Sequence, residues 1–150
     1  MEVQPRGTAR PEINGLAFFD TNVLVYADDA SSAEKQDRSI ALFAEHLRRG
    51  TAVVSLQVLQ EYFVAVTRKL GLASEMAQRK VELLARGRAV RFEARDAIAA
   101  IELHRLTQIS LWDALSVHAA RSAGAAVLYT EDLHAGAVLG GVRVVNPFVN

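Results

Sequence analysis

Hydrophobic positions along the chain alternate between two spacings. Short, largely apolar runs at residues 16–19, 51–55, 89–93, 126–129 and 142–145 predict strands. Between them, apolar residues recur every three or four positions, which predicts helices at 33–49, 57–70, 74–86, 94–107 and 110–123, with a shorter helix just after residue 20. Strands separated by helices are typical of βαβ units. We therefore expect an α/β fold with a mainly parallel sheet covered on both faces, in a strand order that periodicity leaves open.

The breaks in this pattern predict the boundaries of the domain. Residues 1–15 contain two prolines and scattered charges without periodicity, so we predict a flexible N-terminal arm there and one domain over residues 16–150. Ser74 is a candidate N-cap for the helix at 74–86. Residues 131–141 show neither spacing, and we predict a loop or a short helical turn.

Composition excludes several classes of protein. A chain of 150 residues with 51% hydrophobic residues suits one domain with one core and is unlike a disordered protein. The absence of cysteine excludes disulfides and thiolate metal sites, and the net charge of zero gives no sign of a strongly basic nucleic-acid binder. No apolar run approaches the roughly 18 residues of a membrane span, and the N-terminus lacks the apolar segment of a secretory signal. We therefore expect a cytoplasmic protein that does not associate with membranes.

Two acidic residues directly follow predicted strands. Asp20 comes after residues 16–19, and open α/β sheets bind ligands just beyond the carboxyl ends of such strands. The alternative is that Asp20 only caps the helix that follows it. Asp132 comes shortly after residues 126–129, where an ordinary polar loop is the alternative. Its neighbour Glu131 could equally point inward on spacing alone.

Two further acidic residues lie on predicted helices. Glu61 falls about 60° outside the apolar stripe of its helix and has no Lys or Arg three or four positions away, whereas a solvated surface Glu often has one. Asp113 ends the sequence S-L-W-D, which fits a capping box with Ser110 as the N-cap. Asp113 is also an isolated acid on an apolar helix, and one residue can serve as both cap and metal ligand.

These acids would form a functional site if the fold brings them together. Each pair of like charges at ~4 Å costs about 4 kcal/mol at an effective dielectric constant near 20. A cluster of three or four carboxylates therefore needs protons or cations, and a purely oxygen ligand set favours Mg²⁺ or Mn²⁺. The chemistry that follows from such a site is metal-assisted hydrolysis, for example of a phosphodiester.

The segments that carry these acids resemble a known family. FFDTNVLVYA, SLQVLQEYF, SLWDALSVHAARSAGAAVLYTEDLHAG and VRVVNPF together look like a PIN domain, most similar to bacterial toxin ribonucleases of the VapC type. The resemblance extends from Leu16 to Phe148. It implies a three-layer α/β/α fold with a central, mainly parallel sheet of about five strands, and hydrolysis of RNA with Mg²⁺ or Mn²⁺.

The resemblance also implies roles for individual residues. The four acids of the family fall on Asp20, Glu61, Asp113 and Asp132. Direct or water-mediated metal contact is expected of Asp20, Asp113 and Asp132, whereas Glu61 would position or deprotonate the water or join the metal shell. The small polar residues that would line or brace the site are Asn22, Ser110 and Thr130. The toxin role, within a type II toxin–antitoxin pair, implies a cognate antitoxin and a homodimer.

Other functions share parts of this pattern. A phosphatase or dehalogenase with Asp20 as nucleophile would require a second Asp two positions later, where this chain has Asn22. A PIN-like RNA-binding or scaffold module without turnover, and a PIN nuclease that cuts DNA, remain as alternatives. Trp112 could stack on a base, although a core or dimer-contact role is more common for such an aromatic residue.

Overall fold

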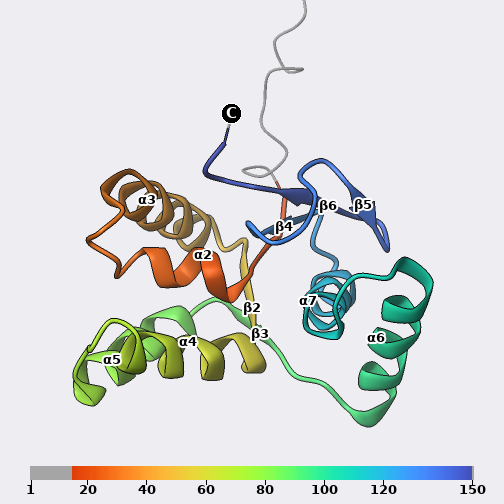
Figure 1. Ribbon diagram of the computed structural model, residues 1–150, viewed down its shortest axis with the longest axis horizontal. Coiled ribbons are helices and arrows are strands. Elements are labelled where there is room, and N and C mark those ends of the chain that lie inside the picture. Colours follow the sequence, from red (N-terminus) through yellow and green to blue (C-terminus); the bar gives the residue numbers. More distant parts are fainter. Residues whose placement is uncertain (1–14, 150) are drawn as a thin grey trace, which may run out of the picture.

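The structure, a computed structural model, describes residues 15–149, so almost all of the predicted arm lies outside the described residues (Figure 1). The strands are β1 (Ala17–Phe19), β2 (Ala52–Ser55), β3 (Arg88–Val90), β4 (Val127–Tyr129), β5 (Val138–Leu139) and β6 (Val142–Val145). The helices are α2 (Thr21–Tyr26), α3 (Ala33–Arg49), α4 (Leu56–Arg68), α5 (Ser74–Leu84), α6 (Ala94–Thr107) and α7 (Leu111–Ser122). Among the described residues, none of these helices combines the length and the apolar character that crossing a membrane requires.

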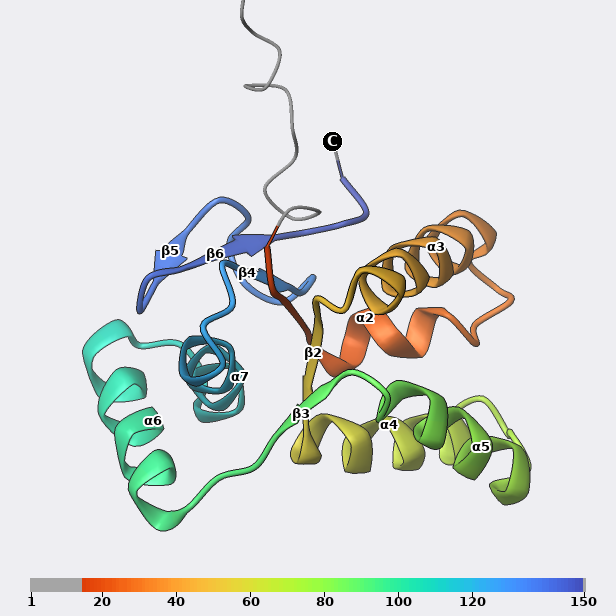
Figure 2. The same ribbon diagram turned by 180° about the vertical axis from the view of Figure 1, so that it is seen from behind.

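The strands form one six-stranded sheet in the order β3-β2-β1-β4-β6-β5. Neighbouring strands from β3 to β6 pair in parallel, and only β5 runs antiparallel to its neighbour β6. Helices α2, α3, α4 and α5 lie on one side of the sheet, and α6 and α7 lie on the other (Figures 1 and 2). The predicted three-layer α/β/α fold with a mainly parallel sheet is therefore confirmed.

Two local predictions were wrong. The segment 131–141 contains the short strand β5, where we expected a loop or helical turn. Two residues are too few to show a periodicity, and the strand exists because Gly140 and Gly141, with φ of 56° and 83°, turn the chain back onto β6. Ser74 is not an N-cap either, because Ala73 occupies that position and Ser74 is the first helical residue of α5.

The core is built around the central strand β1. Ala17, Phe18 and Phe19 are all fully buried, because β1 has a strand on each side and helices on both faces. The ring of Phe19 lies 5.0 Å from those of Phe43 and Tyr129, so it packs α3 and β4 together. This packing fixes the end of β1, where Asp20 follows.

The strand order determines where a ligand can bind. From β1 the chain continues through α3 to β2 on one side, whereas β4 occupies the other side and is reached only after β3, α6 and α7. The connections thus leave β1 and β4 in opposite directions, which opens a crevice beyond their carboxyl ends. Phe19 pairs with Tyr129 across these two strands, so Asp20 and Thr130 follow at the same level of the sheet.

Candidate metal centre

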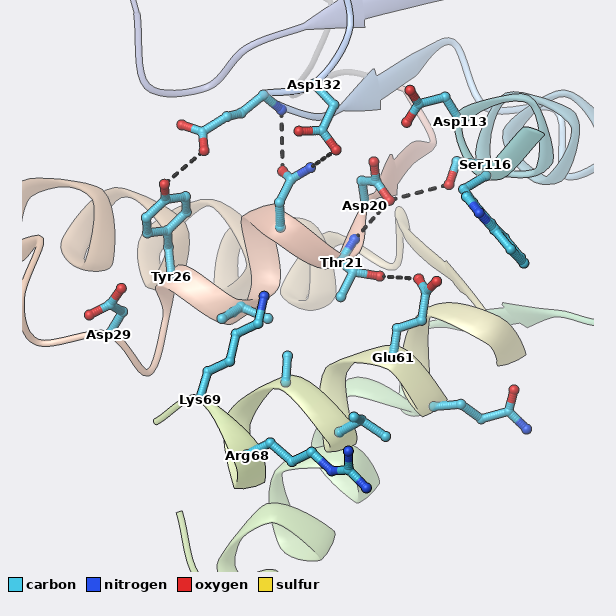
Figure 3. A pocket seen from close by; sticks show the side chains of 17 residues that line it. Asp20, Thr21, Tyr26, Asp29, Glu61, Arg68, Lys69, Asp113, Ser116 and Asp132 are labelled. Atoms are coloured by element: carbon cyan, nitrogen blue, oxygen red, sulfur yellow. Dashed lines mark hydrogen bonds between the residues drawn. The ribbon is translucent and has the colours of Figure 1, made fainter. Parts of the chain in front are cut away.

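Three carboxylates converge at this crevice. Asp20 follows β1, Asp113 lies in the first turn of α7, and Asp132 follows β4 (Figure 3). Each offers one oxygen atom, and the three oxygens lie within 4.8 Å of one another. The structure therefore brings together three of the four acids that the sequence singled out, from the beginning and the end of the described chain.

Asp20 is both a helix cap and a member of this cluster. Its carboxylate accepts hydrogen bonds from the Thr21 backbone N–H at 2.9 Å, from Ser116 Oγ at 3.2 Å and from Thr130 Oγ1 at 2.9 Å. Only 7% of the residue is exposed. Burial raises the pKa of Asp20 from 3.8 to about 6, because the low-dielectric surroundings disfavour its charged form and its hydrogen bonds offset this only in part. Asp20 therefore caps α2 and also belongs to the acidic cluster, so the two predictions for it are compatible.

Asp113 is positioned by the start of α7. Ser110 is the N-cap of this helix, as predicted, and its Oγ accepts a hydrogen bond from the Asp113 backbone N–H at 3.0 Å. Ser110 thus braces the site from outside the cavity. Burial also raises the pKa of Asp113 above its ordinary value.

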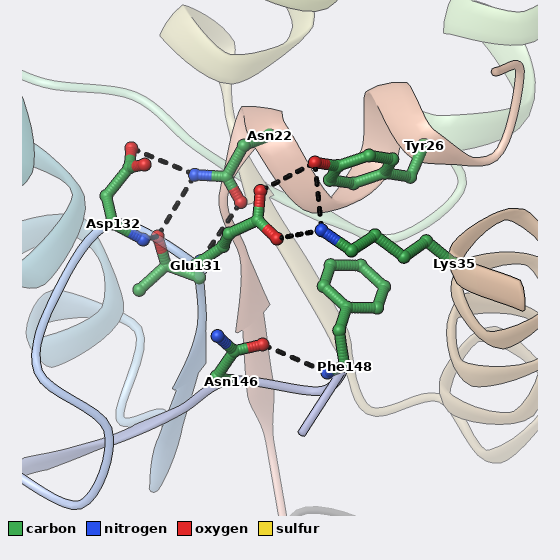
Figure 4. Close-up of polar contacts among 8 residues, drawn as sticks. Asn22, Tyr26, Lys35, Glu131, Asp132, Asn146 and Phe148 are labelled. Carbon is green, nitrogen blue, oxygen red and sulfur yellow. Dashed lines mark hydrogen bonds and ion pairs between the residues drawn. The ribbon is translucent and has the colours of Figure 1, made fainter. Parts of the chain in front are cut away.

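Asp132 is held by two of the predicted bracing residues, Thr130 and Asn22, of which Figure 4 labels Asn22. Asn22 Nδ2 donates to Asp132 Oδ2 at 3.0 Å and to Thr130 Oγ1 at 3.1 Å. The Asp132 backbone N–H donates to the same Thr130 Oγ1 at 3.1 Å. Thr130 in turn donates to Asp20, so one hydroxyl group links the two acids that follow β1 and β4.

Glu131, the other acid that could have pointed inward, lies apart from the cluster. Its carboxylate accepts hydrogen bonds from Tyr26 and from Lys35, each at 2.7 Å. Although burial raises its pKa, these two partners bring the pKa of Glu131 below its ordinary value. The ambiguity between Glu131 and Asp132 is thus resolved in favour of Asp132.

Glu61 lies in the wall of the same cavity, outside the group of three carboxylates (Figure 3). Its Oε1 accepts a hydrogen bond from Thr21 Oγ1 at 2.7 Å, and its Oε2 accepts one from Gln57 Nε2 at 3.2 Å. The amide of Gln57, four residues before Glu61, thus supplies the hydrogen bond that a Lys or Arg side chain often gives a surface Glu. The structure places Glu61 near the acids, and its part in the chemistry stays a prediction.

The acids open into a cavity of about 770 Å³. Its wall also includes Ser116, Arg68, Lys69 and Trp112, none of which was predicted as a site residue. Ser116 could have been found, because it lies three positions after Asp113 and therefore on the same face of α7. Trp112 is 64% exposed, so a place for it in the core is excluded.

The donor set fits a hard divalent cation. All three groups are carboxylates, the ligands that Mg²⁺ and Mn²⁺ prefer, and they come from three separately anchored elements. Their mutual repulsion and the burial of Asp20 make the cluster unfavourable when it is fully charged and unaccompanied. Fold and site together define an α/β domain with a cluster of three carboxylates at the switch point of its sheet.

The comparisons with known proteins agree with this class. The PIN domain family model matches residues 17–138, and the chain therefore belongs to the PIN domain family. The comparison with curated proteins gives no match.

Solved structures of similar fold include toxins and toxin–antitoxin complexes. Mycobacterium tuberculosis VapC20, a sarcin-ricin loop cleaving toxin, is 24% identical, with a TM-score of 0.63, covering 77% of this chain and 89% of that one. A toxin–antitoxin complex from Klebsiella pneumoniae is 21% identical, with a TM-score of 0.60 and coverage of 87% and 97%. VapBC2 from Rickettsia felis, bound to a fragment of its promoter DNA, is 20% identical, with a TM-score of 0.61 and coverage of 86% and 96%. At these identities the likeness shows the fold.

Proposed function

We propose that this protein is a divalent-metal-dependent endoribonuclease that hydrolyses RNA phosphodiester bonds, and that it is the toxin of a type II toxin–antitoxin pair. The observation that carries the proposal is the convergence of Asp20, Asp113 and Asp132 within 4.8 Å at the switch point of a PIN-domain sheet. The similar structures, which include a cleaving toxin and a toxin–antitoxin complex, support the same proposal.

The three aspartates would hold Mg²⁺ or Mn²⁺. Bound there, the ion would activate water and stabilise the charge that develops on the phosphodiester. The chain's own contribution is preorganisation, because Thr130, Ser116 and the Thr21 backbone N–H fix the Asp20 carboxylate in one orientation. Asn22 does the same for Asp132.

Two other parts of the cavity wall would act on the substrate. Glu61 is anchored through Thr21 and Gln57, and its carboxylate would orient the attacking water or accept its proton. Arg68 and Lys69 line the same cavity at the C-terminal end of α4 and would attract the phosphates of the RNA strand.

The partners follow from the same proposal. A cognate antitoxin would bind this protein and block access to the acids, and the active form would be a homodimer. Size-exclusion chromatography with light scattering tests the dimer, and co-purification with a co-expressed candidate antitoxin tests the complex.

Cleavage of a mixed pool of structured RNAs by the purified protein tests the activity. We expect cuts at defined positions with Mg²⁺ or Mn²⁺, none with EDTA, and loss of cutting in Asp20→Asn. Asp29→Asn is the matched control, because Asp29 lines the same cavity but lies outside the three-carboxylate group.

The same assay separates the alternatives. Cutting of single-stranded DNA in preference to RNA would identify a DNA-cutting PIN nuclease. RNA binding without any cutting, in protein free of antitoxin and supplied with either metal, would favour the binding or scaffold module.

A further inference from the structure

Glu131 and Asp132 are adjacent carboxylates with different surroundings. Asp132 faces Asp20 and Asp113, whereas Glu131 lies across Asn22, against Tyr26 of α2 and Lys35 of α3 (Figure 4). The family resemblance gave Glu131 no role. Its side chain and its backbone nevertheless both make hydrogen bonds to other elements.

Three residues define that position, namely Tyr26, Lys35 and Phe148. Tyr26 OH and Lys35 Nζ each lie 2.7 Å from a Glu131 oxygen, and Lys35 Nζ also donates to Tyr26 OH at 3.3 Å. The Lys35 ammonium lies 4.7 Å from the centre of the Tyr26 ring and 5.4 Å from that of Phe148. These two rings meet edge to face at 5.0 Å, so they enclose the ammonium from two sides.

A chain of hydrogen bonds connects this cluster to the candidate metal centre. The Glu131 backbone N–H donates to Asn22 Oδ1 at 3.2 Å, and Asn22 Nδ2 donates to Asp132 Oδ2 at 3.0 Å. The Asn22 amide is therefore oriented by the backbone of residue 131 and in turn orients the carboxylate of residue 132. Movement of Glu131 would change the orientation of Asn22 and, through it, the orientation of Asp132.

We propose that Lys35 and Tyr26 are positioning residues for Asp132. By holding Glu131 against α2 and α3, they fix the segment 130–132 and keep a fourth carboxylate out of the candidate cation site. This inference rests on the proposed function, because it takes Asp132 to be a metal ligand.

The Lys35–Glu131 ion pair is too exposed to contribute much to the stability of the fold. The side chains of Lys35 and Glu131 are 39% and 25% exposed, and pairs of this kind contribute little to folding. Helix α3 carries a comparable pair, Glu45–Arg48 at 2.6 Å, with side chains 34% and 69% exposed. Neither Glu45 nor Arg48 lines the cavity that contains the three aspartates, so this pair is a matched control on the same helix.

The test is Mn²⁺ binding to the full chain, measured by isothermal titration calorimetry, together with the unfolding temperature in EDTA. The double variant Lys35→Met/Glu131→Gln removes the ion pair without changing the net charge. We expect Mn²⁺ binding to weaken about three- to tenfold, less than for loss of a direct partner of a ligand. The control Arg48→Met/Glu45→Gln should stay within about twofold, as expected for a surface pair.

The direction in which a single substitution changes the Mn²⁺ affinity is an independent test. Lys35→Met alone leaves the site more negative, so a purely long-range charge effect would tighten Mn²⁺ binding. Weaker binding in both Lys35→Met and the double variant supports positioning.

Three results would overturn the inference. The first is an unchanged Mn²⁺ affinity in the double variant, which would leave the proposed nuclease intact if the wild-type chain binds Mn²⁺ and Asp132→Asn does not. The second is a loss of affinity that occurs only together with a large fall in unfolding temperature, since that indicates a structural role. The third is failure of the wild-type chain to bind Mn²⁺, which would refute the metal centre as well.

Discussion

Asp20→Asn should stabilise the metal-free protein while removing its activity. The substitution keeps the size of the side chain and removes a charge that the fold buries at 7% exposure. Because the pKa of Asp20 rises from 3.8 to about 6 on folding, the folded state binds this proton more tightly than the unfolded state. Stability from Asp20 is therefore complete below pH 3.8 and is lost as the pH rises through 6.

The magnitude follows from the same pKa. A difference of about two units in pKa corresponds to about 3 kcal/mol in the free energy of unfolding. The wild-type protein has lost this amount by neutral pH. Asparagine carries no charge, so the variant avoids this loss of stability. Its NH₂ group, however, faces the hydroxyl of Thr130 or Ser116, and in the wild-type protein each of these hydroxyls donates a hydrogen bond to Asp20. That mismatch costs about 1 kcal/mol. We therefore expect a net gain of about 2 kcal/mol at pH 7.5, or a rise of about 4–8 °C in the unfolding temperature.

Urea unfolding of both proteins in EDTA, from pH 3.5 to pH 7.5, measures this difference. Asp20→Asn should be about 1 kcal/mol less stable at the acidic end, where the wild-type carboxyl is protonated, and more stable at the neutral end. A difference that does not vary with pH would refute the reasoning. Excess Mg²⁺ should stabilise the wild-type protein and leave the variant unchanged, because only the former has the complete ligand set.

Three further substitutions test separate parts of the structure. Asn22→Ala removes the amide that aims Asp132, and Mn²⁺ affinity by calorimetry should fall about 10- to 100-fold; a change below twofold would contradict the bracing role. Glu61→Gln should reduce RNA cleavage about 100-fold with little change in Mn²⁺ binding, because Glu61 lies outside the three-carboxylate group. Equal losses in both assays would instead place Glu61 among the metal ligands. Phe18→Ala empties a fully buried position of the central strand and should cost about 3–5 kcal/mol in urea unfolding. A cost below about 1 kcal/mol would mean that this part of the core collapses around the gap.

The acids at strand ends were predictable because strand geometry is local. A short apolar run followed by Asp20 or Asp132 marks the carboxyl end of a strand, and parallel pairing then brings such ends to one edge of the sheet. Ser110 was predictable for a similar reason, since its link to Asp113 spans three residues.

Tertiary contacts decided what the sequence left open. The choice between Glu131 and Asp132 depends on Lys35, which lies 96 residues away along the chain. The hydrogen bond from Ser116 to Asp20 likewise joins α7 to the end of β1. The sequence around either residue does not indicate this contact, because it depends on how α7 packs on the sheet. Strand order, which places β4 beside β1, is a property of the whole sheet.

The placement of β1 beside β4 has a consequence for the growing chain on the ribosome. The candidate ligands are residues 20, 113 and 132, and β1 can pair with β4 only after residue 129 has been made. A nascent chain that stops before residue 132 lacks the third carboxylate, whatever structure its earlier segments form. The three carboxylates can therefore come together only after residue 132 has been made, when all the helices and four of the six described strands already precede it in the chain.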